Sequence, residues 1–71
     1  MNMTFGEKVR NLRKSKRLSQ KELSSISKIP FFTIVSIELG RSRIPQITTV
    51  IKYAKVFNMS IDKLLKGVVF N

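Results

Sequence analysis

Start and stop signals for two short helices stand close together in this sequence, and no other feature constrains the fold as strongly. Ser19 and Glu22 have the spacing of a capping box, in which each side chain accepts a hydrogen bond from the backbone amide of the other residue. Leu18 and Leu23 occupy the positions of a hydrophobic staple around this cap. Farther along the chain, Gly40 offers the left-handed conformation that ends a helix. We therefore expect one helix to begin after Ser19 and another to end at Gly40, with a tight turn between them.

Apolar residues at helical spacing give these two helices their inward faces. In the first helix, Leu23 and Ile26 are expected to point into the core. Pro30 suits the first turn of a helix and marks the start of the second one. Ile34 and Ile37 then form the inward face of that second helix.

The N-terminal part of the chain predicts a helix of its own. Thr4 and Glu7 form another capping box, directly before an apolar face of helical period. The residues of this face are Phe5, Val9 and Leu12. We expect the helix to cover residues 5–16.

The C-terminal half predicts two more helices, so the fold class is all-α with five helices. Asn58 can close the first of them, and Ser60 can cap the second, which ends at Gly67. The apolar face of the first comprises Ile47, Val50, Ile51, Ala54 and Phe57, and that of the second comprises Ile61, Leu64 and Leu65. The β-branched residues follow a period of about 3.6 rather than the alternation of a strand.

Size and composition narrow the classes of function. A chain of 71 residues suits one small domain, which we place at 1–67, followed by an apolar tail at 68–71. The sequence has no cysteine and no histidine, so it lacks disulfides and the commonest metal ligands and catalytic bases. We expect no enzymatic activity, no metal ion and no cofactor. Short apolar runs and the lack of an export signal indicate a cytoplasmic protein without a membrane span.

The charge indicates a polyanionic partner. Fourteen lysines and arginines stand against four acidic residues, which gives a formal net charge of +10. Such a surface attracts nucleic acid or anionic lipid. Basic helices at a membrane surface are an alternative, but a folded core with well-marked helix caps argues against it.

These signals together resemble the XRE-type helix-turn-helix family, which includes lambda-repressor-like and Cro-like proteins. The resemblance runs from Phe5 to Gly67 and rests on Arg13, Leu18-Ser19-Gln20, Glu22-Leu23, Ile34, Ile37-Glu38, Gly40, Pro45, Ala54, Ser60-Ile61-Asp62 and Leu64-Leu65. It implies a compact lambda-repressor-like domain of five helices. It also implies that the second and third helices read double-stranded DNA and that the protein binds as a homodimer.

Five residues are candidates for contacts with DNA phosphates. Gln20 follows the second helix cap, where free backbone amides attract anions, and the family places a phosphate at this position. Arg41, Ser42 and Arg43 follow the end of the third helix, beside the reading surface. Arg10 is the best candidate on the first helix. The alternative for all five is an ordinary solvated side chain.

Arg13 and Glu38 correspond to an intramolecular ion pair of the family. It would join the first helix to the end of the third, and it is best understood as structural. A carboxylate near a helix C-terminus opposes the helix dipole, and an arginine partner resolves this conflict.

The third helix departs from a usual reading helix, because its outer face is nearly all apolar. The candidates for base readout are Phe31, Phe32, Thr33, Val35 and Ser36. Phe32 and Val35 can pack on thymine methyl groups, whereas Phe31 is more consistent with core burial. Exposed apolar residues here can instead mark a surface for another protein.

Two residues around the turn depart from the family pattern. Ser24 replaces the alanine that the family favours in a tight contact between helices, and it is small enough to fit. Lys28 replaces a glycine in the turn, so a left-handed conformation there would strain it.

The C-terminal part is the expected dimer surface, formed by Ile61, Leu64, Leu65, Val68 and Phe70. Alternatively, the tail folds back over the core. Two functions follow: a transcriptional regulator of the phage-repressor, Cro-like or restriction–modification controller type, or a protein-interaction module such as an antitoxin or anti-repressor that uses the third helix.

Overall fold

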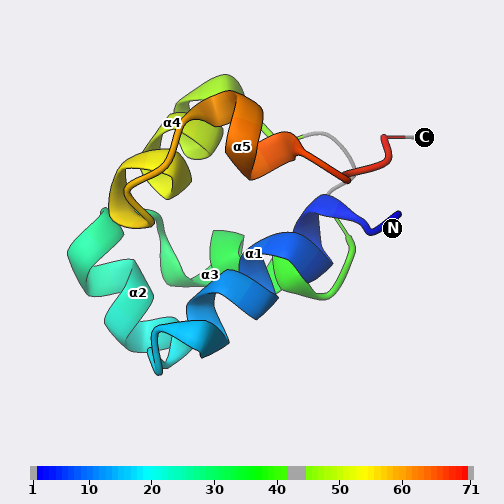
Figure 1. Ribbon diagram of the computed structural model, residues 1–71. Helices are drawn as coiled ribbons and strands as arrows, with labels where there is room; N and C mark the ends of the chain where they lie inside the picture. The colour runs from blue at the N-terminus through cyan, green and yellow to red at the C-terminus, as the bar shows by residue number, and fades with distance from the viewer. Residues whose placement is uncertain (1, 42–44, 71) are drawn as a thin grey trace.

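The computed structural model describes residues 2–41 and 45–70, and these residues form five α-helices (Figure 1). The helices are α1 (Phe5–Ser15), α2 (Gln20–Ser27), α3 (Phe31–Glu38), α4 (Ile47–Val56) and α5 (Ile61–Leu65). The predicted all-α, lambda-repressor-like fold is confirmed. None of the described helices has the length and apolar character needed to cross a bilayer.

The predicted helix starts are confirmed by their hydrogen bonds. Thr4 and Glu7 bond reciprocally, at 2.9 Å from the Thr4 amide and 3.1 Å from the Glu7 amide. Ser19 and Glu22 do the same at 2.8 and 3.0 Å. The bonds that Glu7 and Glu22 accept from backbone amides lower the pKa of both carboxyl groups. Ser60 caps α5 by accepting from the Lys63 amide at 3.1 Å.

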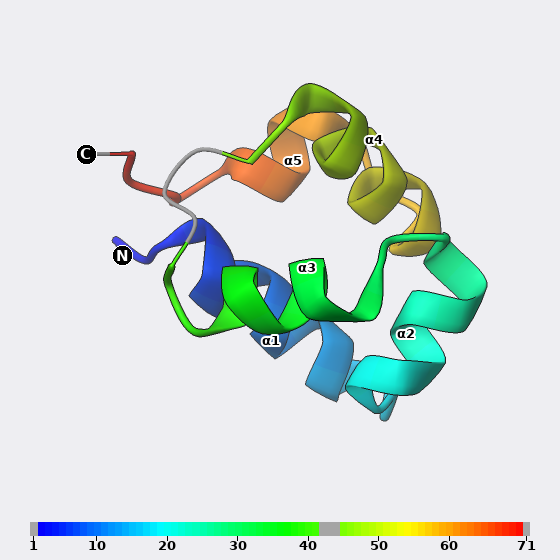
Figure 2. The same ribbon diagram turned by 180° about the vertical axis from the view of Figure 1, so that it is seen from behind.

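The five helices enclose one hydrophobic core. α1 packs along α3, α2 packs against both α3 and α4, and α5 packs against α4 (Figures 1 and 2). Fully buried side chains from every helix meet in the middle; the largest are Tyr53, Leu23, Ile29, Ile34, Ile37, Leu64 and Val9. Burial of these groups supplies most of the favourable free energy available to so small a domain.

Two predicted helix faces are wrong in part, because the helices are rotated from the expected register. Ile26 is 57% exposed, and α2 turns Ser27 inward beside Leu23 instead. Ile47 on α4 is 62% exposed, and Tyr53 takes the inward position. Each rotation has a physical gain: Ser27 bonds to the turn that follows α2, and the Tyr53 ring buries a larger apolar area than an isoleucine.

Tyr53 is the centre of an aromatic cluster in the core. Its ring meets Phe5 edge to face at 5.6 Å between centroids and stacks near Phe57 at 6.0 Å. The hydroxyl group of Tyr53 is buried and has no hydrogen-bond partner among the described residues. Burial raises the pKa of this hydroxyl well above its usual range, and the charge of Glu38 adds to the shift.

The C-terminal tail pairs with the N-terminal segment. The Met3 amide donates to the Gly67 carbonyl at 3.0 Å, and the Val69 amide donates to the Met3 carbonyl at 2.8 Å. The resulting parallel bridge between Met3 and Val68 is the only extended pairing within residues 2–41 and 45–70. Val68 packs against the core. The tail therefore folds back over the domain, as the alternative interpretation of the sequence had it.

Gly6 is the point of closest approach between α1 and α3. A Cβ atom at this position would overlap the backbone carbonyl oxygen of Ile37. Because the obstacle is backbone rather than a flexible side chain, any larger residue must push the two helices apart. Gly6 therefore sets how closely α1 lies against α3.

We expect Gly6→Ala to lower the free energy of unfolding by about 3 kcal/mol or more, measured by urea denaturation, because the helix pair must separate. Gly40→Ala is the control. Gly40 has a φ of +78° and open space around the missing Cβ, so this change adds only backbone strain of about 1–2 kcal/mol. Equal losses in the two variants would contradict the assigned role of Gly6.

Candidate nucleic-acid interface

The turn between α2 and α3 is fastened by two serines of α2. The Ser24 hydroxyl donates to the Ile29 carbonyl at 2.6 Å, and the Ile29 amide donates to the Ser27 hydroxyl at 3.1 Å. Both backbone polar groups of Ile29 are thereby paired while its side chain is buried. Ser24 thus does more than fit a tight contact: the hydroxyl group fixes the angle at which α3 leaves the turn.

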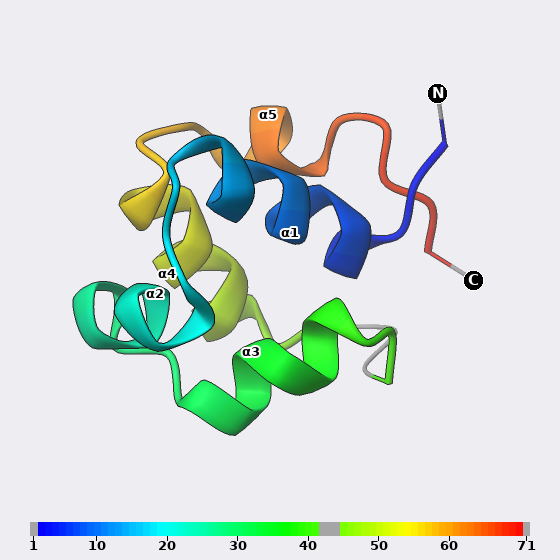
Figure 3. The same cartoon turned by 90° about the horizontal axis from the view of Figure 1, so that it is seen from below.

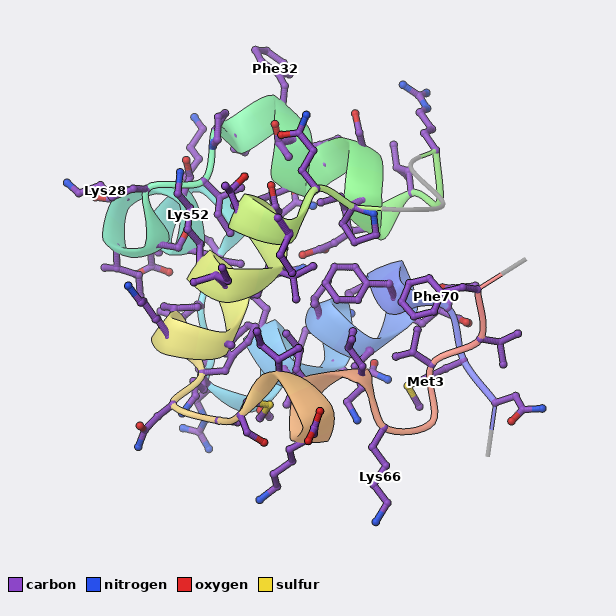
Figure 4. The ribbon with its side chains drawn as sticks, turned by 90° about the horizontal axis from the view of Figure 1, so that it is seen from above. Met3, Lys28, Phe32, Lys52, Lys66 and Phe70 are labelled. Carbon is purple, nitrogen blue, oxygen red and sulfur yellow. The ribbon has the colours of Figure 1, made fainter. Side chains whose placement is uncertain are left out.

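Lys28 occupies the left-handed position of this turn, with a φ of +67°. The strain expected from a non-glycine residue at this point is therefore present. The Lys52 ammonium group donates to the Lys28 carbonyl at 3.3 Å, which links the turn to α4. Figure 4 shows the two lysines side by side at one edge of the molecule.

The predicted ion pair between Arg13 and Glu38 is confirmed. Arg13 donates from Nε to Glu38 Oε2 at 2.8 Å and from Nη2 to Oε1 at 2.9 Å. The two side chains are only 11% and 3% exposed. The hydrogen bond to Glu38 raises the pKa of the Arg13 guanidinium, so this group stays positively charged.

Arg13 and Glu38 each have a third contact, both with the start of α2. Arg13 Nη1 donates to the Leu18 carbonyl at 2.7 Å, and Gln20 Nε2 donates to Glu38 Oε1 at 3.2 Å. The sequence did not predict these two contacts, because they depend on how α1, α2 and α3 converge. The pair therefore fixes the position of α2 as well as that of α3.

The end of α3 follows the Schellman pattern expected from Gly40. The Gly40 amide donates to the Ile37 carbonyl at 3.0 Å, and the Arg41 amide donates to the Ser36 carbonyl at 2.9 Å. Arg41 is exposed directly after this stop. Two other predicted phosphate contacts, Ser42 and Arg43, lie outside the described residues. Arg10 is exposed on α1.

The outer face of α3 is apolar, as predicted. Phe32 is 79% exposed, and in Figure 4 its ring projects away from the body of the protein. Thr33, Val35 and Ser36 are half-buried around it. Core burial of Phe31 is wrong: this side chain is half-buried and meets Phe32 edge to face at 5.5 Å between ring centroids. Phe31 therefore supports the exposed ring of its neighbour.

A groove between α3 and the start of α4 adds polar residues that the sequence did not indicate. Its walls combine Phe32, Thr33 and Ser36 of α3 with residues from the α4 side, which are Gln46, Thr48, Thr49 and Lys52. Gln46 is the N-cap of α4 and makes no hydrogen bond to it through its side chain. The position of Gln46 at a helix start was the one sequence feature that could have suggested this part of the site. Nothing in the sequence indicated that the start of α4 lies beside α3.

A family profile described as a helix-turn-helix domain matches residues 6–69 of this chain. The chain belongs to the XRE-type helix-turn-helix family. Two relatives are uncharacterised helix-turn-helix-type transcriptional regulators, one from Rickettsia prowazekii (strain Madrid E) and one from Rickettsia conorii (strain ATCC VR-613 / Malish 7). Each is 32% identical over 78 aligned positions, which cover all of this chain and 85% and 72% of the respective relative.

In this helix-turn-helix domain, the residues expected at a dimer surface lie in different environments. Ile61 and Phe70 are exposed, at 36% and 44%, whereas Leu65 and Val68 are half-buried against the core. Leu64 is fully buried in the core of its own chain, so its side chain has no surface left for a second copy. Ile51 and Met59 line a shallow depression together with Ile61, which extends the apolar surface onto α4.

No three acidic, histidine or cysteine side chains of residues 2–41 and 45–70 gather into a group that could hold a metal ion. The helix-turn-helix unit exposes the outer face of α3, with polar groove walls beside it and the exposed basic residues Lys28 and Arg41 near its two ends.

We expect Lys28→Gly to raise the free energy of unfolding by about 0.5–1 kcal/mol, because glycine removes the strain of the left-handed turn. Ser25→Gly, on the exposed side of α2, should lower it by about 0.5 kcal/mol, since glycine is a poorer helix former than serine. Thermal and urea denaturation of both variants measure these changes. A loss of stability in Lys28→Gly would show that the turn gains more from the lysine than it loses in strain.

Proposed function

We propose that this helix-turn-helix regulator binds a two-fold symmetric operator as a homodimer, with α3 in the major groove, and represses transcription in the cytoplasm. The observation that carries this proposal is the outer face of α3: a helix fixed on its inner side by Ile34 and Ile37, with Phe32 projecting from a chain of net charge +10. A rigid exposed helix on a cationic domain suits a duplex groove. Figure 3 shows α2 and α3 at one side of the molecule, with the turn between them.

Phosphate contacts are proposed on both sides of α3. At the start of α2, the free backbone amides and the Gln20 side chain would bind a DNA phosphate. One N–H of the Gln20 amide is donated to Glu38, which leaves the second for a phosphate oxygen. At the other end of α3, Arg41 follows the Gly40 stop, and we assign Ser42, Arg43 and Arg10 to the same role as flanking contacts. The first turn of α4, with Gln46 and Thr48, adds donors at the groove edge.

Base readout is proposed to combine apolar and hydroxyl contacts. Phe32 and Val35 would pack on thymine methyl groups, which distinguish thymine in the major groove. Thr33 and Ser36 supply the hydroxyl groups on this side of α3, and hydroxyls can bond to several base edges. Phe31 holds the Phe32 ring in place through the edge-to-face contact. Sequence preference would therefore favour steps rich in thymine.

The dimer surface is proposed to centre on Ile61, with Phe70, Leu65 and Val68 at one side and Ile51 at the other. Ile61 and Ile51 share one surface depression, so a second copy could cover both at once. Two chains of net charge +10 repel each other in solution. A DNA duplex neutralises that repulsion, so we expect dimerisation to be much stronger on the operator than off it.

A protein-interaction function, of the antitoxin or anti-repressor kind, is the second candidate. Among the described residues, Phe32 is the most exposed large hydrophobic side chain, and Leu39, the C-cap of α3, is 62% exposed. An exposed apolar surface of this kind suits contact with a partner protein as well as contact with a DNA groove.

Selection from random double-stranded DNA should yield a motif with two inverted half-sites about one helical turn apart, roughly 10 base pairs between centres. The mass of the complex in solution should correspond to two chains per duplex. Enrichment of an asymmetric motif by a single chain would contradict the homodimer, and no enrichment at all would contradict DNA recognition.

Two single variants separate phosphate contacts from base contacts. Arg41→Ala should weaken binding to all sequences alike and reduce the slope of log affinity against log salt by about 0.9 for each copy. Phe32→Ala should keep that slope and relax the preference for thymine, at about 1–3 kcal/mol of discrimination for each contacted base pair. If Phe32→Ala leaves the selected motif and its affinity intact but abolishes binding to a protein partner, the interaction module is the correct function.

A further inference from the structure

Glu38 connects the two helices of the motif through one carboxylate group. Its Oε2 accepts from Arg13 Nε at 2.8 Å, while its Oε1 accepts from both Arg13 Nη2, at 2.9 Å, and Gln20 Nε2, at 3.2 Å. The Glu38 side chain is 3% exposed, so these bonds form in a largely desolvated environment. The amide end of Gln20 is thus attached to the last residue of α3.

The carboxylate also determines which way the Gln20 amide faces. An ionised carboxylate only accepts hydrogen bonds, so Gln20 must present its NH₂ group, not its carbonyl oxygen, to Glu38. A glutamine free in solution exposes either end of the amide equally well. Beside a phosphate the two orientations are not equivalent, because the carbonyl oxygen would meet another acceptor while the second N–H donates to it.

We infer that Glu38 is a positioning residue for DNA binding, because it holds the Gln20 amide with an N–H directed toward the DNA phosphate. This inference rests on the proposed phosphate contact of Gln20. Glu38 is also the last residue of α3. A displacement of α3 in the DNA groove would therefore also move the Gln20 amide that contacts the phosphate. Base readout and phosphate binding are therefore coupled through a single side chain.

This role is separate from the structural ion pair, since Arg13 has its own route to α2. Arg13 reaches the Leu18 carbonyl directly at 2.7 Å, without Gln20. A substitution of Arg13 therefore weakens the contacts that join the helices, whereas a substitution of Glu38 also frees the Gln20 amide. Arg13 and Glu38 variants give matched controls for the two functions of the pair.

The first arm of the test uses the full chain without DNA. In the nuclear magnetic resonance spectrum, the two side-chain amide protons of Gln20 should be well separated in shift and should exchange slowly, because one of them is bonded to Glu38. Glu38→Asp keeps the charge but shortens the side chain, and it should bring both signals to the position of an exposed glutamine. Arg13→Lys should leave them in place. Unchanged Gln20 signals in Glu38→Asp would overturn the inference.

The second arm is a double-mutant cycle on operator affinity, measured where every variant is folded. Gln20→Met and Glu38→Asp should each weaken binding by about tenfold per half-site, and the double variant should be no weaker than either alone. Arg13→Lys, which keeps a cation beside Glu38, should lower the unfolding midpoint in urea and weaken binding less than Glu38→Asp does. Additive losses in the cycle, or an Arg13→Lys loss as large as that of Glu38→Asp, would reduce Glu38 to a structural residue.

Glu38→Gln should also free the Gln20 amide, because a neutral amide at position 38 can present either its oxygen or its NH₂ group to Gln20. If this variant unfolds, Glu38→Asp and the Gln20 signals still decide the question. If the wild-type chain binds no DNA while its Gln20 signals are those of a bonded amide, the proposed function fails and the fixed orientation of Gln20 stands. If it binds DNA and the signals are those of a free amide, the inference alone fails.

Discussion

The largely buried ion pair between Arg13 and Glu38 is the interaction on which the arrangement of the first three helices depends. Removing two charges from water is expensive, and their attraction in the interior often does no more than offset that loss. The pair is therefore better understood as a geometric constraint than as a source of stability. It satisfies the two charges in one arrangement only, in which α1 crosses the end of α3 and the start of α2 lies within reach of both side chains.

Close packing around this pair makes the constraint rigid. Gly6 allows the α1 backbone to approach the Ile37 carbonyl, one residue before Glu38. Tyr53 lies close enough that both charges act on its hydroxyl group, and its ring is locked between Phe5 and Phe57. The Tyr53 hydroxyl has no hydrogen-bond partner among the described residues, so the contacts of this residue are those of its ring. α3 is thus supported by a region in which neither charge nor volume can change freely.

Local signals allowed much of this fold to be predicted from the sequence. The caps at Thr4 and Ser19 and the stop at Gly40 depend on residues within one helical turn, so they are readable without any tertiary information. The inward register of short helices is different. An α2 of eight residues can rotate by one position at little cost, and only its contacts with α3 and α4 decided that Ser27 rather than Ile26 faces the core.

The candidate site was less predictable for the same reason. Gln20 and Arg41 could be proposed from their places next to helix ends, and the Arg13–Glu38 pair from the family pattern. The bond from Gln20 to Glu38, the groove walls from Gln46 to Lys52 and the burial of Leu64 all arise where distant segments meet. Helical periodicity predicts which apolar residues face the core, but it does not predict which residues of other helices pack against them.

The bridge between Met3 and Val68 brings the two ends of the chain to the same side of the molecule (Figure 1). Lys8 strengthens this closure by donating to the Lys66 carbonyl at 2.9 Å. Contacts between the first and last segments couple the two ends of the chain, which favours cooperative unfolding of the whole domain. A polypeptide joined at either end would therefore leave from that shared corner, which is remote from Phe32 (Figure 4).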